Sequence, residues 1–321
     1  MPSLIETAPE SARKERVCPP GSWDTHFHIF ELDRFELSPR RHFTPAHTPL
    51  ADFEAFQHKL GIEHPAIAHG LSFGLDISSI YRYLEYFNGT ARAFAVIDLE
   101  TVTDGDLRRM HDAGVKGIRI DYHHHKAQHD LQEQIKCLKA YSARVAPFKW
   151  AIQVYHPHPE FWSELAAVVA ELPTPVVLDH FGALKTASLA NYTQSETTDF
   201  DVLRQPGLDA ITTLLRSGKL WIKLSAPYRC SEAGPEYLDM ETLVKALVQA
   251  NPDRVLYGSD WPHTQPFHRR PKNLEPTDIE PFVDFDDYTW VKTLKTWLSE
   301  EEWQKLMVKN PRVLMQYDRD D

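Results

Sequence analysis

Two histidines separated by one residue stand near the start of the chain, in the stretch GSWDTHFHIF (residues 21–30). On a β-strand, side chains two residues apart point to the same face, so His26 and His28 are predicted to present both imidazoles to one side. Neutral imidazoles bind metal ions, form hydrogen bonds to substrates, or lie hydrogen-bonded in a core. The spacing alone leaves these three uses open.

Further polar residues stand where apolar runs end. They are Arg119 and Asp121, Tyr155 and His156, Asp179 and His180, Ser225 and Arg229, and finally Asp260. Burying a neutral polar group without a partner costs roughly 1–3 kcal/mol, and burying a charge costs more. Polar residues in these places therefore indicate a site, which needs elements that bring the ends of several strands together.

Eight short apolar runs supply such elements, and most are followed by a segment of helical periodicity. The predicted strands are Ser22–Ile29, Ala66–Phe73, Arg92–Leu99, Val115–Tyr122, Lys149–Tyr155, Pro175–His180, Leu220–Ser225 and Val255–Asp260. The predicted helices include Asp104–Ala113, Leu131–Ala146, Pro159–Glu171, Leu208–Ser217 and Glu241–Ala250. This alternation predicts an α/β fold, a (β/α)8 barrel of the TIM type, whose active site lies at the carboxyl ends of the strands.

The organisation is interpreted as one barrel domain over residues 21–321, after a polar leader at residues 1–20. Within the unit TDGDLRRMHDAGVKGIRI, Thr103 is predicted to cap a helix and Gly114 to end it. A proline-rich segment without periodicity, at about residues 262–284, follows the eighth strand and is expected to cover one face of the barrel as a loop. A dinucleotide-binding sheet is not supported, because no G-x-G-x-x-G run follows a strand.

Composition narrows the function classes. The net charge of −11 argues against nucleic acid as a partner, since phosphate binding needs a basic surface. No apolar stretch is long enough for a membrane span, and the polar first residues do not resemble a secretory signal, so a cytoplasmic location is expected. The three cysteines are widely separated, which predicts neither a disulfide framework nor a zinc site.

Five motifs together resemble the amidohydrolase superfamily. They are DTHFHIF (24–30), GVKGIRID (114–121), VVLDHFG (176–182), YGSDWPH (257–263) and NPRVLMQYD (310–318), and they occur in the expected order across nearly the whole chain. The resemblance is stronger to the amidohydrolase-related branch that includes 2-pyrone-4,6-dicarboxylate lactonase and related lactone hydrolases. It implies an amidohydrolase-like barrel and a hydrolase that acts on a carboxylic ester bond.

The resemblance also assigns the site. His26 and His28 fall on the first strand, His180 on the sixth and Asp260 on the eighth. In metal-dependent members the first-strand pair and the last aspartate bind a divalent metal, helped by a ligand from the fourth or fifth strand. Here the fifth strand reads WAIQVYHPHP, with Gln153 or Tyr155 where a ligand histidine is expected, and the fourth lacks a terminal lysine.

We therefore expect a lactonase that needs no cofactor. Asp260 is predicted to activate water as the general base. His26, His28 and His180 are predicted to hydrogen-bond the lactone carbonyl and the developing oxyanion. The alternative is a zinc- or manganese-dependent hydrolase or non-oxidative decarboxylase, in which His26, His28 and Asp260 are the metal ligands. A non-catalytic binding protein with the same pocket is a third interpretation.

Two arginines point to an anionic substrate, because a guanidinium offers a planar fork suited to carboxylates. Arg119 follows an apolar strand, and its alternative is a salt bridge to Asp121 or Asp98. Arg229 corresponds to a carboxylate-binding arginine of the resembling lactonase, and its alternative is a plain surface residue. Tyr155 is expected to orient the ring of the substrate and His124 to reach one of its oxygens. The expected partner is a small anionic lactone or carboxylic acid, with a homo-oligomer as a further possibility.

Overall fold

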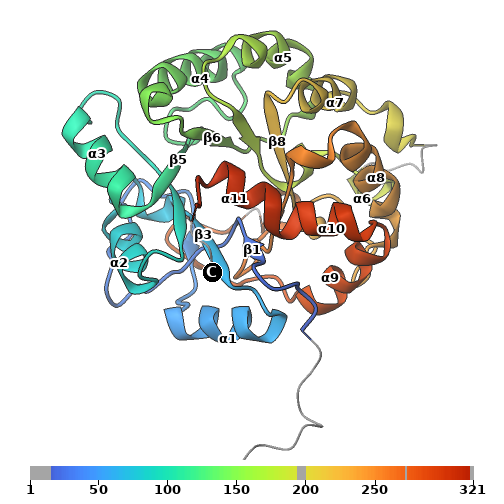
Figure 1. The fold of residues 1–321 in the computed structure, drawn as a ribbon, viewed down its shortest axis with the longest axis horizontal. Coiled ribbons are helices and arrows are strands. Elements are labelled where there is room, and N and C mark those ends of the chain that lie inside the picture. The colour runs from blue at the N-terminus through green and yellow to red at the C-terminus, as the bar shows by residue number, and fades with distance from the viewer. Residues whose placement is uncertain (1–15, 194–199, 272, 319–321) are drawn as a thin grey trace, which may run out of the picture.

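Eight parallel strands form the centre of the protein, in a computed structural model that describes residues 16–193, 200–271 and 273–318. In their order around the sheet they are β1 (Trp23–Asp24), β3 (His64–Ala68), β4 (Arg92–Ala95), β5 (Val115–Arg119), β6 (Ala151–Val154), β7 (Val176–Leu178), β8 (Leu220–Ser225) and β9 (Val255–Gly258). The first and last strands are joined by hydrogen bonds, since the Thr25 amide donates to the Tyr257 carbonyl at 3.0 Å and the His28 amide to the Trp261 carbonyl at 2.7 Å. The sheet thus closes on itself, and the predicted (β/α)8 barrel is confirmed (Figure 1).

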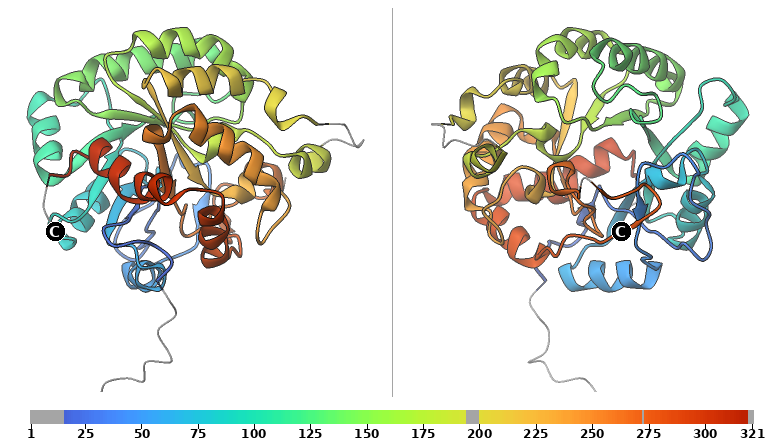
Figure 2. Two further views of the ribbon diagram at one scale, coloured as in Figure 1. Left: turned by 45° about the vertical axis from the view of Figure 1, so that its right-hand side comes forward. Right: turned by 180° about the vertical axis from the view of Figure 1, so that it is seen from behind.

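Helices surround the barrel in Figure 1 and Figure 2. Their bounds are α1 (Leu50–Leu60), α2 (Ser78–Tyr86), α3 (Asp104–Ala113), α4 (Leu131–Val145), α5 (Trp162–Glu171), α6 (Ala187–Thr193), α7 (Leu208–Arg216), α8 (Glu241–Ala250), α9 (Asp287–Thr296), α10 (Glu300–Gln304) and α11 (Asn310–Leu314). Helix α3 shows how local sequence sets such bounds. The Thr103 hydroxyl accepts the Asp106 amide, and the helix ends at Gly114 with a left-handed φ of 117°, as predicted.

Several strands are shorter than predicted, because the backbone leaves the ladder where the polar residues begin. The predicted Ser22–Ile29 strand is reduced to β1, since the buried Asp24 carboxylate takes the backbone amides of His26 at 3.0 Å and Ser259 at 2.9 Å. The predicted Ala66–Phe73 strand ends at Ala68, and the chain then forms a tight turn over Leu71–Phe73. The pattern of apolar residues does not show where backbone amides bond to a nearby side chain instead of to the neighbouring strand.

The inside of the barrel is packed with side chains rather than open. Trp23, Ala66, Phe94, Ala151, Val177, Trp221 and Leu256 form one buried cluster with Leu314, Met315 and Tyr317 from the C-terminal segment. Helices α10 and α11 cross the viewer's end of the barrel in Figure 1. A second and larger core lies mainly between the strands and the outer helices. The amino end of the barrel is therefore filled, and the carboxyl end is left for a site.

The long segment after β9 lies at that carboxyl end. Its strand β10 (Ile279–Glu280) pairs in parallel with β2 (Thr44–Pro45), which belongs to the loop after β1. The Thr44 hydroxyl also donates to the Pro276 carbonyl at 2.7 Å. The loops that follow the first and last barrel strands are thus tied together, and the segment contributes Thr264, Gln265, Arg270, Pro276 and Glu280 to the wall of a cavity.

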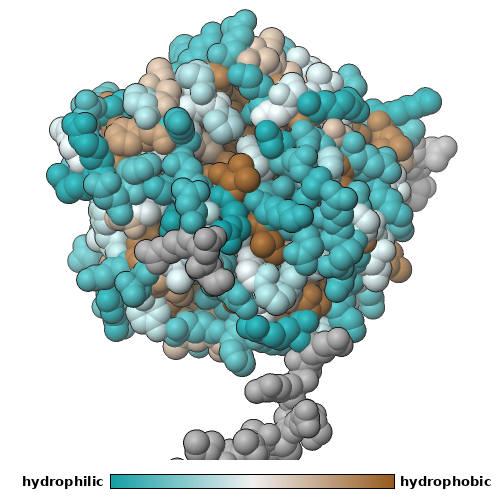
Figure 3. All heavy atoms as spheres, viewed as in Figure 1, coloured by the Kyte–Doolittle hydropathy of each residue, from teal (hydrophilic) through white to brown (hydrophobic). Residues whose placement is uncertain are grey.

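The ends and surface of the molecule complete the fold. Residues 1–15 of the predicted leader lie outside the described residues, whereas Cys18 is buried and its amide donates to the carbonyl of Leu60, at the end of α1, at 3.0 Å. On the face of Figure 1 hydrophilic side chains predominate, and hydrophobic ones occur in small separate groups (Figure 3). Within the described ranges, no helix has the length and apolar character needed to cross a bilayer.

Candidate active site

A cavity of about 370 Å³ opens at the carboxyl ends of the strands. Of the residues predicted from the sequence, its wall contains His28, Arg119, Tyr155, His180, Arg229 and Asp260. His26 is fully buried, and its ring lies 5.0 Å from that of His28 between centroids. The structure therefore brings together seven of the eight predicted site residues.

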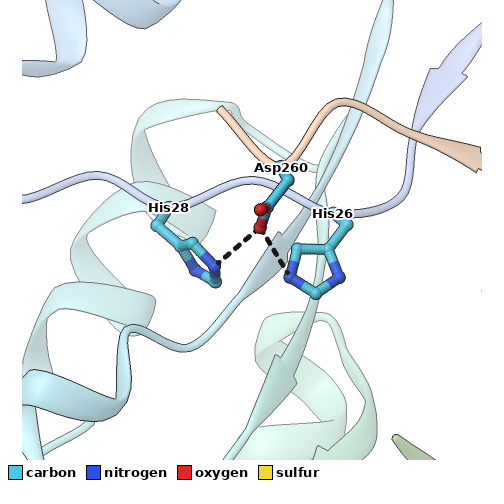
Figure 4. A group of neighbouring side chains, drawn as sticks. All are labelled: His26, His28 and Asp260. Carbon is cyan, nitrogen blue, oxygen red and sulfur yellow. Dashed lines mark ion pairs between the residues drawn. The ribbon is translucent and has the colours of Figure 1, made fainter. Parts of the chain in front are cut away.

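One carboxylate oxygen is the centre of this group. Oδ1 of Asp260 lies 3.5 Å from Nε2 of His26, 3.6 Å from Nε2 of His28 and 3.7 Å from Nε2 of His180. Figure 4 shows the rings of His26 and His28 on either side of this oxygen. In the described part of the chain, neither Asp260 Oδ1 nor His26 Nε2 has a hydrogen-bond partner, although both atoms are buried. Such a pair of unpartnered polar atoms is costly unless a ligand, ion or water lies between them.

The other oxygen of Asp260 is firmly held. Oδ2 accepts hydrogen bonds from the Tyr228 hydroxyl at 2.7 Å and from Arg229 at 3.0 Å (Nε) and 2.8 Å (Nη2). Burial opposes ionisation, but the adjacent Arg229 guanidinium holds the pKa of Asp260 well below its usual range. Asp260 is thus ionised and oriented, with Oδ1 directed among the imidazoles.

The guanidinium of Arg229 therefore bonds mainly to other residues of the protein. Besides Asp260, its Nη2 donates to the carbonyl of Thr264 at 2.9 Å and to its hydroxyl at 2.7 Å. The alternative of a plain surface arginine is wrong, because only 9% of the side chain is exposed. Its direct role on a substrate carboxylate stays a prediction.

Arg119 leaves more of its guanidinium for a ligand. Nη1 donates to the His69 carbonyl at 3.0 Å, and Nη2 lies 4.0 Å from Oδ2 of Asp179. The side chain is 10% exposed and lies in the cavity wall. These contacts differ from the salt bridge to Asp121 or Asp98 that the sequence left as the alternative.

The hydrogen bond that Nδ1 of each imidazole makes with the protein determines whether Nε2, which faces the cavity, is a donor or an acceptor. Nδ1 of His28 lies 2.8 Å from the Ala68 carbonyl, which can only accept, so this nitrogen carries the proton. Burial lowers the pKa of His28, so the ring is neutral near pH 7 and its Nε2 presents a lone pair to the cavity. The expected donation from His28 to a lactone carbonyl does not fit this arrangement.

His180 differs, because its partner is a hydroxyl. Nδ1 of His180 lies 2.8 Å from Ser225 Oγ, which either donates or accepts. Burial lowers the pKa of His180 to about 3, so this ring is also neutral. Its Nε2 is free to carry a proton and donate it as a hydrogen bond into the cavity. The ring of Tyr155 lies 5.3 Å from this imidazole between centroids.

His124 is the predicted site residue that is not in the wall of the main cavity. Its amide donates to Oδ1 of Asp121 at 3.1 Å, and the residue borders a separate crevice of about 10 Å³. From the same run of histidines, His123 lines the main cavity instead. The proposed contact of His124 with a substrate oxygen stays a prediction.

A polar cluster lies behind His26, and of its members Asp179 and Gln153 were named from the sequence but Lys223 was not. Asp179, Lys223 and Gln153 are all fully buried. Nζ of Lys223 lies 3.2 Å from Oδ1 of Asp179 and 3.3 Å from Nδ1 of His26, and Gln153 donates to Oδ2 of Asp179 at 2.7 Å. Burial lowers the pKa of Lys223 to about 8. The signal was the two-residue alternation of β8, which places Lys223 on the same face as Trp221 and Ser225.

Backbone positions next to the site are also constrained. A Cβ atom on Gly258 would lie 2.7 Å from the Cβ of His26, so only glycine lets β9 approach the first strand this closely. His180 and Asp260 have left-handed φ angles of 50° and 63°, which are uncommon for residues with a side chain. Such conformations cluster at functional sites, where the surrounding structure enforces them.

Comparisons with known proteins identify the family of this chain. The model of the amidohydrolase family matches residues 23–315. The chain is 28% identical to the 4-sulfomuconolactone hydrolase of Hydrogenophaga intermedia over 299 residues, which cover 92% of this chain and 88% of that protein. It is 26% identical to the 2-pyrone-4,6-dicarboxylate hydrolase of Comamonas testosteroni, over 97% of this chain and 95% of that protein.

The fold is shared with solved structures as well. A putative 2-pyrone-4,6-dicarboxylic acid hydrolase from Pseudomonas putida superimposes with a TM-score of 0.68 at 22% identity, covering 94% of this chain and 99% of that one. The family model spans nearly the whole barrel, so the resemblance drawn from the five motifs is confirmed. The chain belongs to the amidohydrolase family.

Proposed function

We propose that this protein is a hydrolase that opens a small carboxylated lactone at the Asp260 site. The observation that carries the proposal is the ionised Asp260, whose Oδ1 faces three imidazole nitrogens at 3.5–3.7 Å with no hydrogen-bond partner among the described residues. A carboxylate held in this way is suited to accept a proton from water. Support for a lactone comes from relatives of nearly full length that are named as lactone hydrolases.

The cavity wall supports an anionic substrate. The charge of Asp260 is balanced by Arg229, and the charge of Asp179 is balanced by Lys223 at 3.2 Å. Arg119, 4.0 Å from the already paired Asp179, then adds a further cation to the wall, which also contains Asp121. A carboxylate on the lactone would accept from its guanidinium, and the bond would be strong because both partners are charged.

The residues also fit a divalent metal. His28 presents a lone pair, and the buried atoms His26 Nε2 and Asp260 Oδ1 both lack partners in the described chain. Two imidazoles and a carboxylate are a donor set that Zn²⁺ and Mn²⁺ accept. His26, His28 and Asp260 would hold the ion, which favours the metal-dependent alternative over a cofactor-free site. When bound, the metal would polarise the lactone carbonyl and make water more acidic.

The protein's own groups supply the remaining steps. Water would lose a proton to Asp260 Oδ1 as its oxygen forms a bond to the acyl carbon. Nε2–H of His180 would donate to the carbonyl oxygen as negative charge develops there. The acyl C–O bond of the ring then breaks, and the proton on Asp260 passes to the departing oxygen. The products are a carboxylic acid and a hydroxyl or enol group on one molecule.

Replacing Asp260 by Asn tests the proposal with a panel of carboxylated and neutral lactones, with acid release followed by titration at constant pH. We expect the wild type to prefer carboxylated lactones and Asp260→Asn to lose about 10²–10⁴-fold in kcat, the usual contribution of a general base. Ligand binding should remain, because Asn keeps the shape of the side chain.

Two further samples make the outcome decisive. Chelator treatment of the wild type should lower activity, and added Zn²⁺ or Mn²⁺ should restore it. The surface variant Asp201→Asn, a matched carboxylate change far from Asp260 in sequence and exposed to solvent, should behave as the wild type. Wild-type turnover by Asp260→Asn would refute the proposed role of this carboxylate.

A further inference from the structure

A line of aromatic rings runs along the wall of the cavity, and most of it takes no part in the proposed reaction. The line begins at His28 and continues through Phe30, Phe43, His42 and His123, all of which are in the cavity wall. Successive ring centroids are 5.9, 6.4, 4.9 and 4.8 Å apart. Rings at spacings of about 4.5–7 Å are in contact. The line therefore connects the reacting centre with the loop after β5.

The surrounding residues hold the Phe30 ring in this line. It lies 5.9 Å from the ring of Phe73, in the turn after β3, and is stacked at 6.3 Å with that of Phe282, in the segment after β9. A Cβ atom on Gly70, which is also in the cavity wall, would lie 2.8 Å from Cε1 of Phe30. A larger residue at this position would displace the ring, so glycine preserves the aromatic surface.

Most of the line is uncharged near pH 7. Phe30 and Phe43 carry no charge, and burial lowers the pKa of His42 to about 4, so its imidazole is neutral. The nearby Arg270 guanidinium is paired with Glu280 at 2.8 Å and donates to the His42 carbonyl at 2.7 Å. Neutral rings attract a further ring by edge-to-face and offset contacts, in addition to the gain from burying apolar surface.

The size of the cavity leaves room for such a ring. At about 370 Å³ the cavity falls within the range of about 300–1,000 Å³ that is usual for drug-sized ligands. Asp260 and Arg119, which are proposed to act on the lactone and its carboxylate, follow or end barrel strands, whereas His42 and Phe43 belong to the loop after β1. A substrate that contacts both groups of residues is larger than a single lactone ring.

We propose that the substrate carries a flat aromatic ring beside its lactone, and that Phe43 and His42 bind this ring. The substrate class is then an aryl-substituted lactone with a carboxylate, and Phe43 is a specificity-determining residue. The inference rests on the proposed function, because it names the substrate class of the same site. Its binding part is measured without turnover, with carboxylic acids that contain no lactone.

Calorimetric titration of the wild type with such acids is the first test. Phenylacetate, 3-phenylpropionate and 4-phenylbutyrate are compared with acetate, propionate and butyrate. At least one phenyl acid should bind about ten- to a hundredfold more tightly than the unsubstituted acid of the same length, the value of burying one such ring. The cyclohexyl analogue of that acid should bind about three- to tenfold less tightly than the phenyl acid, because it has no π face. Absence of either difference would overturn the inference.

Phe43→Leu keeps an apolar side chain and removes the ring. The phenyl and cyclohexyl acids should then bind within about twofold of each other, since the ring contact is lost. Phe148→Leu is the matched control, because Phe148 is also half-buried beside two rings, His111 at 5.7 Å and Trp150 at 5.2 Å, but precedes β6 at the amino end of the barrel. It should keep the wild-type ratio. The same ratio in Phe43→Leu as in the wild type would refute the role of Phe43.

A crystal structure of the wild type with the tightest phenyl acid tests the placement if Phe43→Leu does not fold. The ring should lie against Phe43 and His42, and a ring bound elsewhere would contradict the inference. A second carboxylate is the rival occupant, because Arg41 also lines the cavity and has no ion-pair partner in the part of the chain that the structure describes. Tighter binding of succinate than of propionate, without a gain from any phenyl ring, would replace the aryl group by this carboxylate.

The outcomes separate this inference from the proposed function. If the phenyl acids bind as expected and no lactone is opened, the ring site stands and the proposed hydrolysis fails. If carboxylated lactones are opened with the same kcat/KM whether or not they carry an aryl group, the hydrolysis stands and the inference is wrong.

Discussion

At the scale of single residues, the role of each site histidine depends on the atom behind it. Three similar imidazoles surround Asp260, yet the carbonyl behind His28, the carboxylate behind His26 and the hydroxyl behind His180 give them different hydrogen-bonding capacities. A neutral imidazole that donates a hydrogen bond from Nδ1 has only an acceptor at Nε2. The site is therefore described better by these rear contacts than by the residue types that face the cavity.

Arg119 is the residue whose replacement should test substrate charge most directly. In Arg119→Met the apolar stem is largely kept and the charge is lost, so KM for carboxylated lactones should rise about ten- to a hundredfold, the value of one hydrogen bond between charged groups. Activity on neutral lactones should change little. Steady-state kinetics on matched pairs of lactones, with and without a carboxylate, measure this difference.

A control for charge loss exists at the other end of the barrel. Arg92 begins β4 and stacks over the Tyr317 ring at 4.7 Å, among residues that close the amino end. Arg92→Met should leave the preference between the paired lactones unchanged. An equal rise in KM for both lactones in Arg119→Met would contradict a carboxylate contact.

At the scale of elements, the contact between β9 and the first strand positions Asp260. The amide of Asp260 donates to the His26 carbonyl at 2.7 Å, so the proposed base and a proposed metal ligand are joined through the backbone. Gly258 allows this approach, because any side chain there would press on His26. Two segments at opposite ends of the chain thus build one half of the site.

Gly258→Ala should consequently damage both stability and activity. Its Cβ would meet the His26 Cβ at 2.7 Å, and such overpacking typically costs about 1–3 kcal/mol. We expect a lower free energy of unfolding in urea and a fall in kcat, since Asp260 and His26 would separate.

Gly105→Ala is the matched change at an open position. Its nearest neighbour would be the Thr103 hydroxyl oxygen at 3.6 Å, and it lies within α3, where alanine is favoured over glycine by about 0.5–1 kcal/mol. Stability should be equal or higher, with unchanged kcat. Equal behaviour of the two variants would show that the contact between β9 and the first strand is not tightly packed.

At the scale of the whole molecule, the net charge is −11, whereas arginines outnumber acidic residues in the cavity wall. The cavity wall contains four arginines, Arg41, Arg119, Arg229 and Arg270, beside three acidic residues, Asp121, Asp260 and Glu280. Several histidines are buried and neutral in the folded protein. Their protonation therefore links stability to pH across the entire barrel. The oligomeric state stays a prediction.

His156 illustrates the direction of this linkage. It is 1% exposed and its ring lies 5.8 Å from that of Trp162, and burial lowers its pKa to about 3 from an ordinary 6.5. Between these values the unfolded chain binds a proton that the folded chain does not. Stability is therefore full above pH 6.5 and is lost as the pH falls toward 3.

His156→Phe should remove this part of the acid sensitivity. From pH 6.5 to 5.0 the wild type should lose about 1.5 kcal/mol more free energy of unfolding than the variant, because one unit of pKa shift corresponds to about 1.4 kcal/mol. Urea unfolding at both pH values measures the difference. Identical losses would mean that His156 is already accessible to protons in the folded state.

Much of the fold followed from local patterns. Seven of the eight apolar runs contain a barrel strand, the eighth, Ala66–Phe73, overlaps the last residues of β3, and α3 and α8 have the predicted bounds. The predicted strand ends were less accurate near His26 and Ser72, because side chains such as the Asp24 carboxylate compete there for backbone amides. That competition depends on residues far apart in the chain, which periodicity does not contain.

The sequence by itself determined the barrel, the family and most of the residues that reach the cavity, because alternation along strands and motif order are local properties. Only the tertiary structure decided the charge pairing and the hydrogen-bonding capacity of those residues. It paired Arg229 with Asp260, placed Lys223 and Asp179 behind His26, and set the Ala68 carbonyl behind His28. The physical reason is that the proton of an imidazole and the charge of a buried carboxylate depend on neighbours supplied by other strands.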